Sequence, residues 1–168
     1  MNFKSIPREF EYLPWPEVEN ITKDKRSTII WPFGAIEQHG PQLPLATDSI
    51  FIDEIICEVL KLFPSDVPLK KLPTQYMGFS PEHKGFDGTI SLSSNLITSM
   101  IKEVGVQLSE MGFKRLILIN GHGGQISLLN TAARELRSFA PGMAVFPCFL
   151  WSGVNGLSEL LSKAEIEH

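Results

Sequence analysis

Residues Arg115–Gln125 read Arg-Leu-Ile-Leu-Ile-Asn-Gly-His-Gly-Gly-Gln, and this stretch decides the fold. After Arg115, the residues Leu116–Ile119 form a short apolar run, and Arg115–Ile119 is therefore predicted to be a buried strand. The glycines of Asn120–Gln125 predict a sharp turn, because glycine adopts backbone conformations that other residues avoid. The amphipathic stretch Ile126–Phe139 predicts a helix, which Pro141 and Gly142 end. A buried strand, a tight turn and a helix in this order are typical of a parallel crossover.

The same alternation continues in both directions from this stretch. The predicted strands are Ser27–Phe33, Leu72–Met77 and Met143–Leu150, and the predicted helices are Asp48–Leu62 and Ser94–Met111. Gly112 follows the second of these helices, at the position where glycine commonly ends a helix. The sequence therefore predicts one three-layer α/β/α domain over residues 1–168, with helices on both faces of a mostly parallel sheet.

The composition excludes several classes of function. The chain has 168 residues, of which 43% are hydrophobic and 20% charged, enough for one domain with a core. Its 15 basic and 19 acidic residues give a net charge of −4, which argues against nucleic-acid binding. No apolar run approaches the roughly 20 residues of a membrane helix, and the N-terminus is too polar for a signal peptide. The two distant cysteines, Cys57 and Cys148, favour a reduced, cytoplasmic protein.

Three histidines follow predicted strands. His39, His83 and His122 each lie in the loop after one of them. In open α/β sheets the ligand site lies beyond the carboxyl ends of the strands. A single histidine in such a loop is most often a hydrogen-bonded structural residue, but three in this arrangement are expected to converge.

The first of these loops, Gly34–Asp48, carries a set of ligands suited to metal ions. Glu37 and His39 are two residues apart, so their side chains point the same way in an extended segment. Asp48 returns toward them at the start of the next helix. Glu, His and Asp suit Zn²⁺, Mn²⁺ or Fe²⁺. The alternative is that Asp48 only caps its helix.

The other two loops offer further polar groups. His122, in the glycine-rich turn, suits either a metal ligand or a general base. The alternative for this turn is an anion-binding site at a helix N-terminus, which we rank lower because the turn has no P-loop lysine. Glu82 and His83, in the loop Gly78–Thr89, are candidates for contacting a substrate.

Three stretches together resemble the creatininase (creatinine amidohydrolase) family. They are WPFGAIEQHGPQLPLATD at residues 31–48, EHKGFDGTISL at 82–92 and LILINGHGGQ at 116–125. The resemblance runs from about Trp31 to about Phe139. It implies an α/β/α fold and a metal-dependent amidohydrolase with two divalent ions, Zn, Mn or Fe. It also implies a homo-oligomer, with a hexamer as the family's common form.

The resemblance also implies ligand roles. Glu37 and His39 would each bind one ion, Asp48 would bridge the two, and His122 would complete the shell of the first. In creatininase the second ion takes a carboxylate two residues past the histidine of the turn. This chain has Gly124 there, and Gln125 stands where the family commonly has Asn.

Family members with an NGHGG turn take this carboxylate from a later segment resembling His-Ala-Gly-x-x-Glu-Thr. This chain stops at Glu165–His168, about where that segment would begin, after a helix-like stretch, SELLSKAEIEH. The sequence thus resembles the N-terminal two-thirds of a family member. Glu165 or Glu167 is a less favoured source of the missing ligand. With His39 and Asp48 alone on the second ion, we expect about one tightly bound ion per chain.

The expected activity is hydrolysis of a C–N bond in a small amide or cyclic amide by water that the metal ions activate. His83 is the candidate proton donor for the leaving nitrogen among the residues quoted above, whereas the resemblance implies a later histidine, in the segment that would follow His168, as the family's usual donor. Glu82, His83 and Trp151 are candidates for lining the substrate pocket. The alternatives are a catalytically inactive family member and a non-catalytic α/β binding domain. A domain without its last third is also expected to expose apolar surface and to self-associate.

Overall fold

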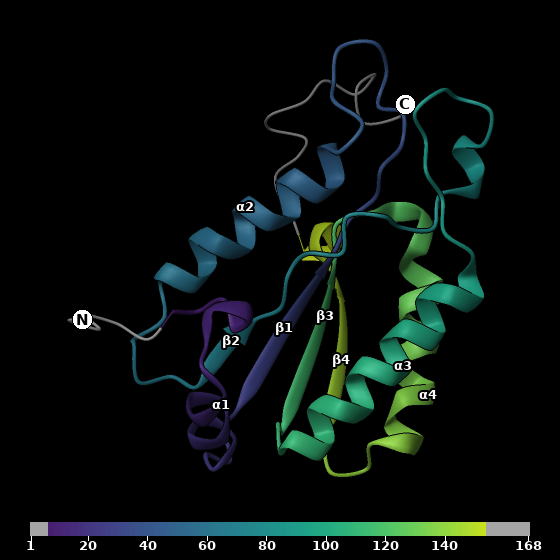
Figure 1. Ribbon diagram of the computed structural model, residues 1–168. Helices are drawn as coiled ribbons and strands as arrows, with labels where there is room; N and C mark the ends of the chain where they lie inside the picture. Colours follow the sequence, from purple (N-terminus) through teal and green to yellow (C-terminus); the bar gives the residue numbers. More distant parts are fainter. Residues whose placement is uncertain (1–6, 154–168) are drawn as a thin grey trace.

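A four-stranded, fully parallel sheet in the order β2-β1-β3-β4 forms the centre of the computed structural model, which describes residues 7–153 (Figure 1). Strands and helices alternate after a short N-terminal helix. The strands are β1 (Thr28–Phe33), β2 (Leu69–Lys71), β3 (Arg115–Asn120) and β4 (Ala144–Phe149). The helices are α1 (Trp15–Thr22), α2 (Thr47–Lys61), α3 (Ser94–Met111) and α4 (Ile126–Phe139). Short 3-10 turns lie at Phe10–Tyr12, Pro81–His83, Gly123–Gln125 and Leu150–Gly153.

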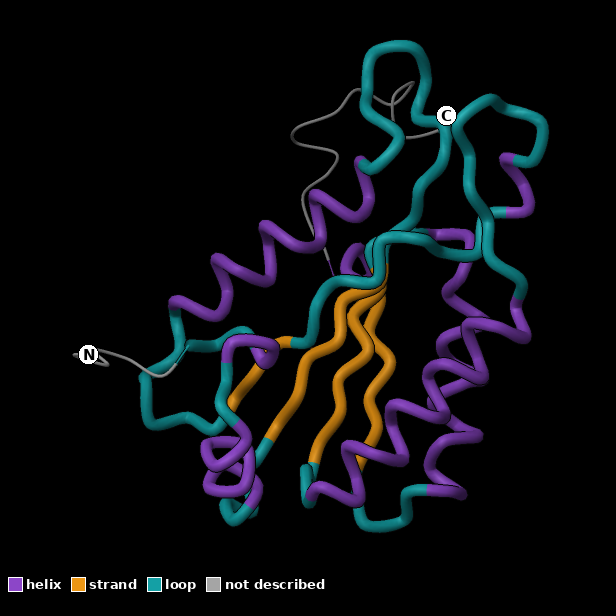
Figure 2. Tube along the Cα trace, in the orientation of Figure 1, coloured by secondary structure: helices purple, strands orange, loops and turns teal. Residues whose placement is uncertain are grey.

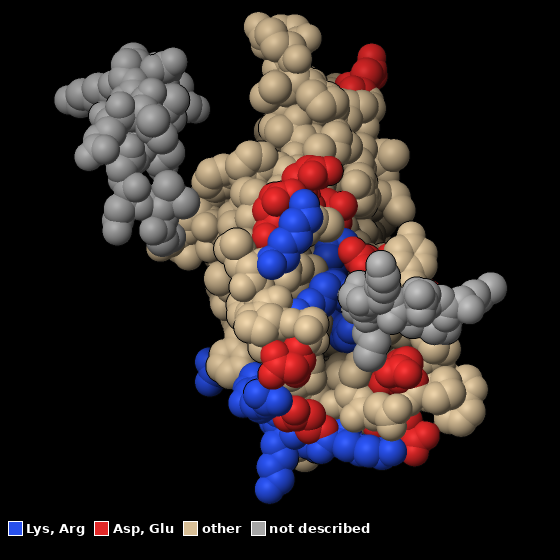
Figure 3. Space-filling model, turned by 90° about the vertical axis from the view of Figure 1, so that its left-hand side faces the viewer, with Lys and Arg blue, Asp and Glu red and all other residues tan. Residues whose placement is uncertain are grey.

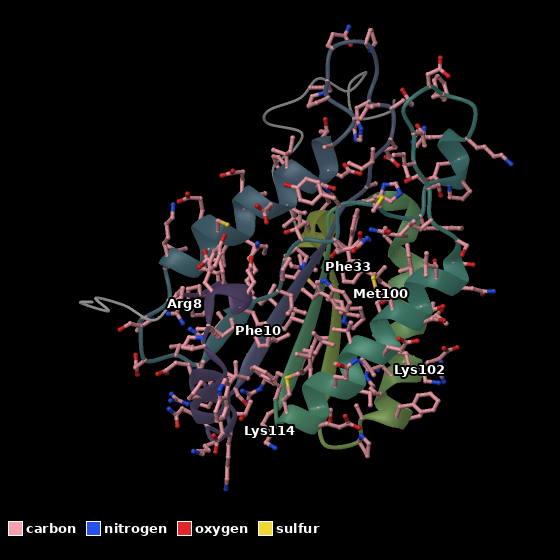
Figure 4. All side chains as sticks on the ribbon, in the orientation of Figure 1. Arg8, Phe10, Phe33, Met100, Lys102 and Lys114 are labelled. Carbon is pink, nitrogen blue, oxygen red and sulfur yellow. The ribbon has the colours of Figure 1, made fainter. Side chains whose placement is uncertain are left out.

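Helices cover both faces of the sheet, which confirms the predicted three-layer fold. Helix α2 lies on one face, and α3 and α4 lie on the other (Figure 1). The residues of β1 alternate between the two, as side chains of a strand must. Phe33 faces Met100 of α3 (Figure 4), whereas Ile30 packs against Ile52 and Ile56 of α2. The sheet therefore separates two apolar clusters.

The helix boundaries follow local signals in the sequence. Ser93 caps α3, since its side chain accepts a hydrogen bond from the backbone N–H of Leu96 at 3.2 Å. Gly112 ends the same helix in the left-handed conformation, with a φ of 105°. The predicted bounds of α3 and α4 are confirmed, and α2 begins and ends one residue before its prediction.

The predicted strand at Leu72–Met77 is wrong. The strand is β2, three residues earlier. The later segment pairs with β1 through a hydrogen bond from the Leu72 N–H to the Ile30 carbonyl and through an isolated bridge between Phe33 and Gln75. The register of β1 and β2 would pair Phe33 with Thr74, so the pairing with Gln75 shows one extra residue in this segment, which ends the regular ladder. The sequence does not predict β2 as a strand, because Lys70 and Lys71 are charged and charged residues usually lie at the surface. Both side chains are nonetheless buried in the structure.

The N-terminal segment was not predicted to form a helix. Helix α1 has no fully buried residue and packs on the core only through half-buried side chains such as Val18 and Ile21. The Arg8 guanidinium ties the preceding segment to β2, because it donates to the carbonyls of Val67 and Leu69. None of the helices within residues 7–153 combines the length and apolar character needed to cross a bilayer.

The order of the strands determines where a ligand site can form. From β1 the chain passes through α2 to β2 on one side and then through α3 to β3 on the other. This reversal opens a crevice between the carboxyl ends of β1 and β3. Figure 2 shows the long loops gathered at that end of the sheet. On the face shown in Figure 3, acidic and basic side chains are interspersed.

Candidate metal centre

The four predicted metal ligands converge at the carboxyl end of the sheet. Asp48 lies at the centre, with Oδ1 3.1 Å from His39 Nε2 and Oδ2 3.0 Å from His122 Nδ1. Glu37 Oε1 is 3.2 Å from the same His122 nitrogen and 3.9 Å from His39 Nε2. The loops after β1 and β3 and the first turn of α2 thus bring two carboxylates and two imidazoles together.

Asp48 does not serve as the cap of α2. The N-cap of this helix is Ala46, without a side-chain hydrogen bond, and Asp48 lies within its first turn. Both carboxylate oxygens face histidine nitrogens, so the capping alternative is wrong. The positive end of the helix dipole lies close to this carboxylate.

A backbone carbonyl orients the His39 ring. The Nδ1 atom is 3.1 Å from the carbonyl oxygen of Glu37, which can only accept a hydrogen bond. Nδ1 therefore carries the proton of the neutral ring. Nε2 is left with a lone pair directed at Asp48, the arrangement that a metal-binding histidine adopts.

The His122 ring is oriented in the same way but with the opposite nitrogen. Nε2 donates to the carbonyl oxygen of Phe79 at 3.0 Å, which leaves the lone pair of Nδ1 facing Asp48 and Glu37. A lone pair against a carboxylate is repulsive unless a cation or a proton lies between them. In the metal-free chain a proton fills this position. Burial alone would lower the pKa of His122, but hydrogen bonds to Asp48 and Glu37 raise it to about 10.

Glu37 is the most deeply buried carboxylate of the centre. Its side chain is 5% exposed, and Oε2 has no hydrogen-bond partner among the described residues. Burial alone would raise the pKa of Glu37, but hydrogen bonds from His122 and Ser80 hold it below its ordinary value. A buried carboxylate oxygen without a donor is costly. A cation would remove this cost, so the residues present fit a divalent metal ion.

The loop before α3 adds Glu82 and His83 to the centre. Two groups of three residues within the described part of the chain have donor atoms within 4.8 Å of one another. One consists of Glu37, His39 and Asp48, and the other of Glu37, Glu82 and His83. They share Glu37, although the resemblance to the family implies Asp48 as the bridge.

His83 presents an N–H to the centre. The Gly40 backbone N–H donates to Gln38 Oε1 at 3.0 Å, so the other amide atom of Gln38 is its nitrogen. That nitrogen donates to His83 Nδ1, also at 3.0 Å. In the neutral ring the proton therefore lies on Nε2, which is 3.7 Å from Glu37 Oε1.

Trp151 lies beside the loop of His122. Its ring stacks on Phe51 of α2, with centroids 5.0 Å apart, and its Nε1–H donates to the Gly121 carbonyl at 3.4 Å. It is 40% exposed and borders the centre. Glu165 and Glu167, the less favoured sources of a further ligand, lie outside the described residues.

Sequence reasoning missed three side chains that shape the centre. Gln38 orients His83, as described above, and the Ser80 hydroxyl lies 3.3 Å from His122 Nε2. Gln125 is fully buried and contacts all three loops. All three are polar residues in loops or turns, where polar residues are common. Their importance becomes clear only from their contacts with the histidines and the loops of the centre. Gln125 alone carried a signal, as a departure from the family's usual Asn.

The anion-binding alternative for the glycine turn does not fit the structure. The carboxylate of Glu82 lies against Gly124, in the 3-10 turn that leads into α4. An anion there would meet this negative charge and those of Glu37 and Asp48. The centre suits cations.

A family model described as creatinine amidohydrolase (creatininase) matches residues 11–168. The mycofactocin precursor peptide peptidase of Mycobacterium tuberculosis is 34% identical over 127 residues, which are 72% of this chain and 50% of that protein. The chain spans about half the length of the curated relatives it matches.

Solved structures confirm the fold. A creatinine amidohydrolase (creatininase) superposes with a TM-score of 0.77 at 23% identity, over 95% of this chain and 65% of that one. A mutant creatininase in a zinc–zinc form superposes with a TM-score of 0.72 at 22% identity, over 97% and 63% of the two chains. The family model covers nearly the whole sequence, and the chain therefore belongs to the creatininase family of hydrolases.

Proposed function

We propose that this chain is a metal-dependent amidohydrolase that hydrolyses a C–N bond in a small or peptide-like amide. The observation that carries the proposal is the pair of histidine lone pairs facing Asp48, one from His39 and one from His122. Each lone pair needs a proton or a metal cation beside the carboxylate, and this set of donors suits a divalent metal ion. Similarity to a peptide peptidase and to creatinine amidohydrolases supports an amide substrate.

The proposed ligands are Glu37, His39, Asp48 and His122. Divalent cations such as zinc or manganese would supply Lewis acidity toward the amide carbonyl and would make a water molecule acidic enough to act near neutral pH. The zinc–zinc form of a related creatininase supports a metal of this kind. The backbone carbonyls that orient His39 and His122 direct the coordinating nitrogens toward Asp48, where a metal ion would take the place of a proton.

The proposed proton donor is His83. Its Nε2–H faces the centre, and Gln38 holds the ring in this tautomer. A proton delivered to the leaving nitrogen lets the C–N bond break without releasing an amide anion. Trp151, stacked on Phe51, offers an aromatic surface at the edge of the centre for the planar amide.

Metal binding by matched variants tests the proposal. We expect Asp48→Asn to lose binding of Zn²⁺ in isothermal titration calorimetry, because both histidines lose their charged partner. Asp87→Asn, which changes an exposed residue of the loop before α3, should bind zinc like the parent chain. Hydrolysis of creatinine and of short peptides should be lost with Asp48→Asn and with a chelator. Undiminished zinc binding by Asp48→Asn would contradict the proposal.

Self-association is the second part of the proposal. The side chains of Phe146 and Cys148 are exposed on the α2 face of the sheet, beyond the apolar cluster that α2 forms with β1, β2 and the half-buried Ile117 and Ile119 of β3. β4 is also the edge strand within the described residues, so one side of it is unpaired. We propose that a second copy of the chain covers this region, as in a homo-oligomer.

A further inference from the structure

The carboxylate of Glu82 occupies the space where a side chain at position 124 would begin. A Cβ placed on Gly124 would lie 1.8 Å from Glu82 Oε1 and 2.8 Å from its Cδ, distances that no structure tolerates. Around the neighbouring Gly123, nothing lies within 4 Å of such a Cβ. The two glycines of the turn thus differ. Gly124 is needed for Glu82 to reach the centre, and Gly123 is not.

The position that Glu82 enters is rich in negative charge. Its donor atom lies within 4.8 Å of those of Glu37 and His83, and Oε1 is 3.4 Å from His122 Nε2. Within residues 7–153, the ion pairs found for Glu37, Asp48 and Glu82 are all with histidines. Three carboxylates gathered without lysine or arginine repel one another unless cations separate them.

Glu37 provides an independent observation that a ligand belongs here. It is more than nine-tenths buried and is a member of both metal-compatible groups, and its Oε2 has no partner among the described residues. The first group already contains His39 and Asp48. The second group approaches Glu37 with Glu82, whose side chain is 41% exposed and can adjust to an ion.

We propose that Glu82 is a metal ligand, supplying the second cation with a carboxylate beyond those of Glu37 and Asp48 within the described residues. The inference rests on the proposed function, because it assumes that the centre holds cations. His83 belongs to the same group, but its Nε2 carries a proton while Gln38 donates to Nδ1. Glu82 is therefore the new ligand, and His83 remains the proton donor.

With Glu82 included, the described part of the chain supplies three carboxylates and two imidazoles to the metal pair. This number changes the expected stoichiometry. The ligands inferred from the sequence left the second ion with two protein donors and predicted about one ion per chain. Glu82 groups with Glu37 and not with His39 and Asp48, so its partly exposed side chain must turn toward those two ligands when the ion binds. It then brings the second site to three protein donors, the usual number for a catalytic ion, so we expect two ions per chain.

The test counts zinc ions per chain by elemental analysis after gel filtration and by calorimetric titration. The parent chain should bind two ions and Glu82→Gln should bind one, a twofold loss. Asp87→Asn, in the same loop and exposed, serves as the matched control and should bind two. Thermal melting of each variant checks that it is folded.

The glycine pair provides a second test that leaves Glu82 itself in place. Gly124→Ala should push the carboxylate out of the centre and bind one ion, whereas Gly123→Ala should bind two. The added methyl at position 124 also lies 2.6 Å from His122 Nε2. The Gly124→Ala chain must therefore retain its first ion for the comparison to support the proposal, and loss of both ions would count against it.

The outcomes separate the two proposals. If Glu82→Gln binds as many ions as the parent chain, Glu82 is not a ligand and this inference is overturned, while binding that depends on Asp48 still supports the proposed function. If the parent chain binds no zinc, both fail.

Discussion

The amide of Gln125 connects the three loops that build the centre. Its nitrogen donates to the carbonyl of Gly34 and to Asn120 Oδ1, both at 3.0 Å, and its oxygen accepts from the Phe79 N–H at 3.1 Å. The side chain is fully buried, so water cannot replace these bonds. One residue thereby sets the distance between the loop of Glu37, the loop that leads to Glu82 and the turn of His122.

Replacing Gln125 tests this connection. We expect Gln125→Leu, which has a similar size but no polar atoms, to leave buried backbone groups without partners and to cost about 1–3 kcal/mol of unfolding free energy. Urea denaturation measures the loss. Gln107→Leu, on the exposed face of α3, is the control and should change stability little. Equal stability of both variants would show that Gln125 does not hold the loops.

Lys70 gives a prediction of pH dependence. Burial, together with the nearby charge of Arg8, lowers the pKa of this lysine from 10.5 to about 8. The unfolded chain therefore binds more protons than the folded chain between pH 8 and 10.5, and stability rises with pH across this interval. Below pH 8 Lys70 is protonated in both the folded and the unfolded chain, so burial of its charge lowers the free energy of unfolding by the full amount.

We accordingly expect Lys70→Met to be more stable than the parent chain at pH 7 and to lose this advantage as the pH approaches 10.5. Urea denaturation at both pH values measures the difference. Lys25→Met, at an exposed position, should show no such trend. An advantage independent of pH would mean that the charge of Lys70 is not the cause.

At the scale of elements, α3 and α4 pack closely because α3 has a glycine at the contact. A Cβ on Gly105 would lie 2.3 Å from Leu136 Cδ2, and the Leu136 side chain is fully buried. In an isolated helix, alanine is more favourable than glycine by about 1 kcal/mol. Here the neighbouring helix leaves no room for the added methyl group.

We expect Gly105→Ala to destabilise the protein by about 1–2 kcal/mol, since overpacking outweighs the gain in helix propensity. The double variant Gly105→Ala with Leu136→Ala should be less destabilised than the sum of the two single changes, because removing the leucine makes room. Gly142→Ala, where the new atom would meet nothing within 4 Å, is the control. Strict additivity would contradict the packing argument.

At the scale of the whole molecule, the two faces of the sheet are covered unequally. Phe146 of β4 is 48% exposed, and Ile117 and Ile119 of β3 are half-buried on the same face. The register pairs Ile117 with Phe146, so these side chains form one apolar strip that begins against the α2 cluster and ends at the exposed Phe146. Apolar strips of this kind usually mark a contact.

We expect the parent chain to self-associate at micromolar concentrations and Phe146→Asp to shift it toward the monomer. Light scattering after size-exclusion chromatography gives the molar mass directly. Leu62→Asp changes another exposed apolar residue away from the strip and should leave the assembly unchanged. A parent chain that elutes as a monomer over this concentration range would refute the expectation.

The amino-acid sequence alone predicts the parallel α/β layering. It also predicts that Glu37, His39, Asp48 and His122 lie close together. Both follow from local patterns. Apolar periods distinguish strands from helices, and parallel strands must place the loops that follow them at one end of the sheet. Glu37, His39 and Asp48 lie within one loop, so their spacing in the sequence is enough to predict that they form a ligand set.

Contacts between residues that are far apart in the sequence can be found only in the tertiary structure. Glu82 meets Gly124 because two loops pack together, and Gln125 reaches its partners 46 and 91 residues away. The position of β2 could not be predicted for the same reason. Lys71 is buried in this strand because its ammonium group lies 2.7 Å from the Asp53 carboxylate, and the sequence does not show this contact. Polarity along the chain predicts exposure, and only the folded chain shows where a partner makes burial of a polar group favourable.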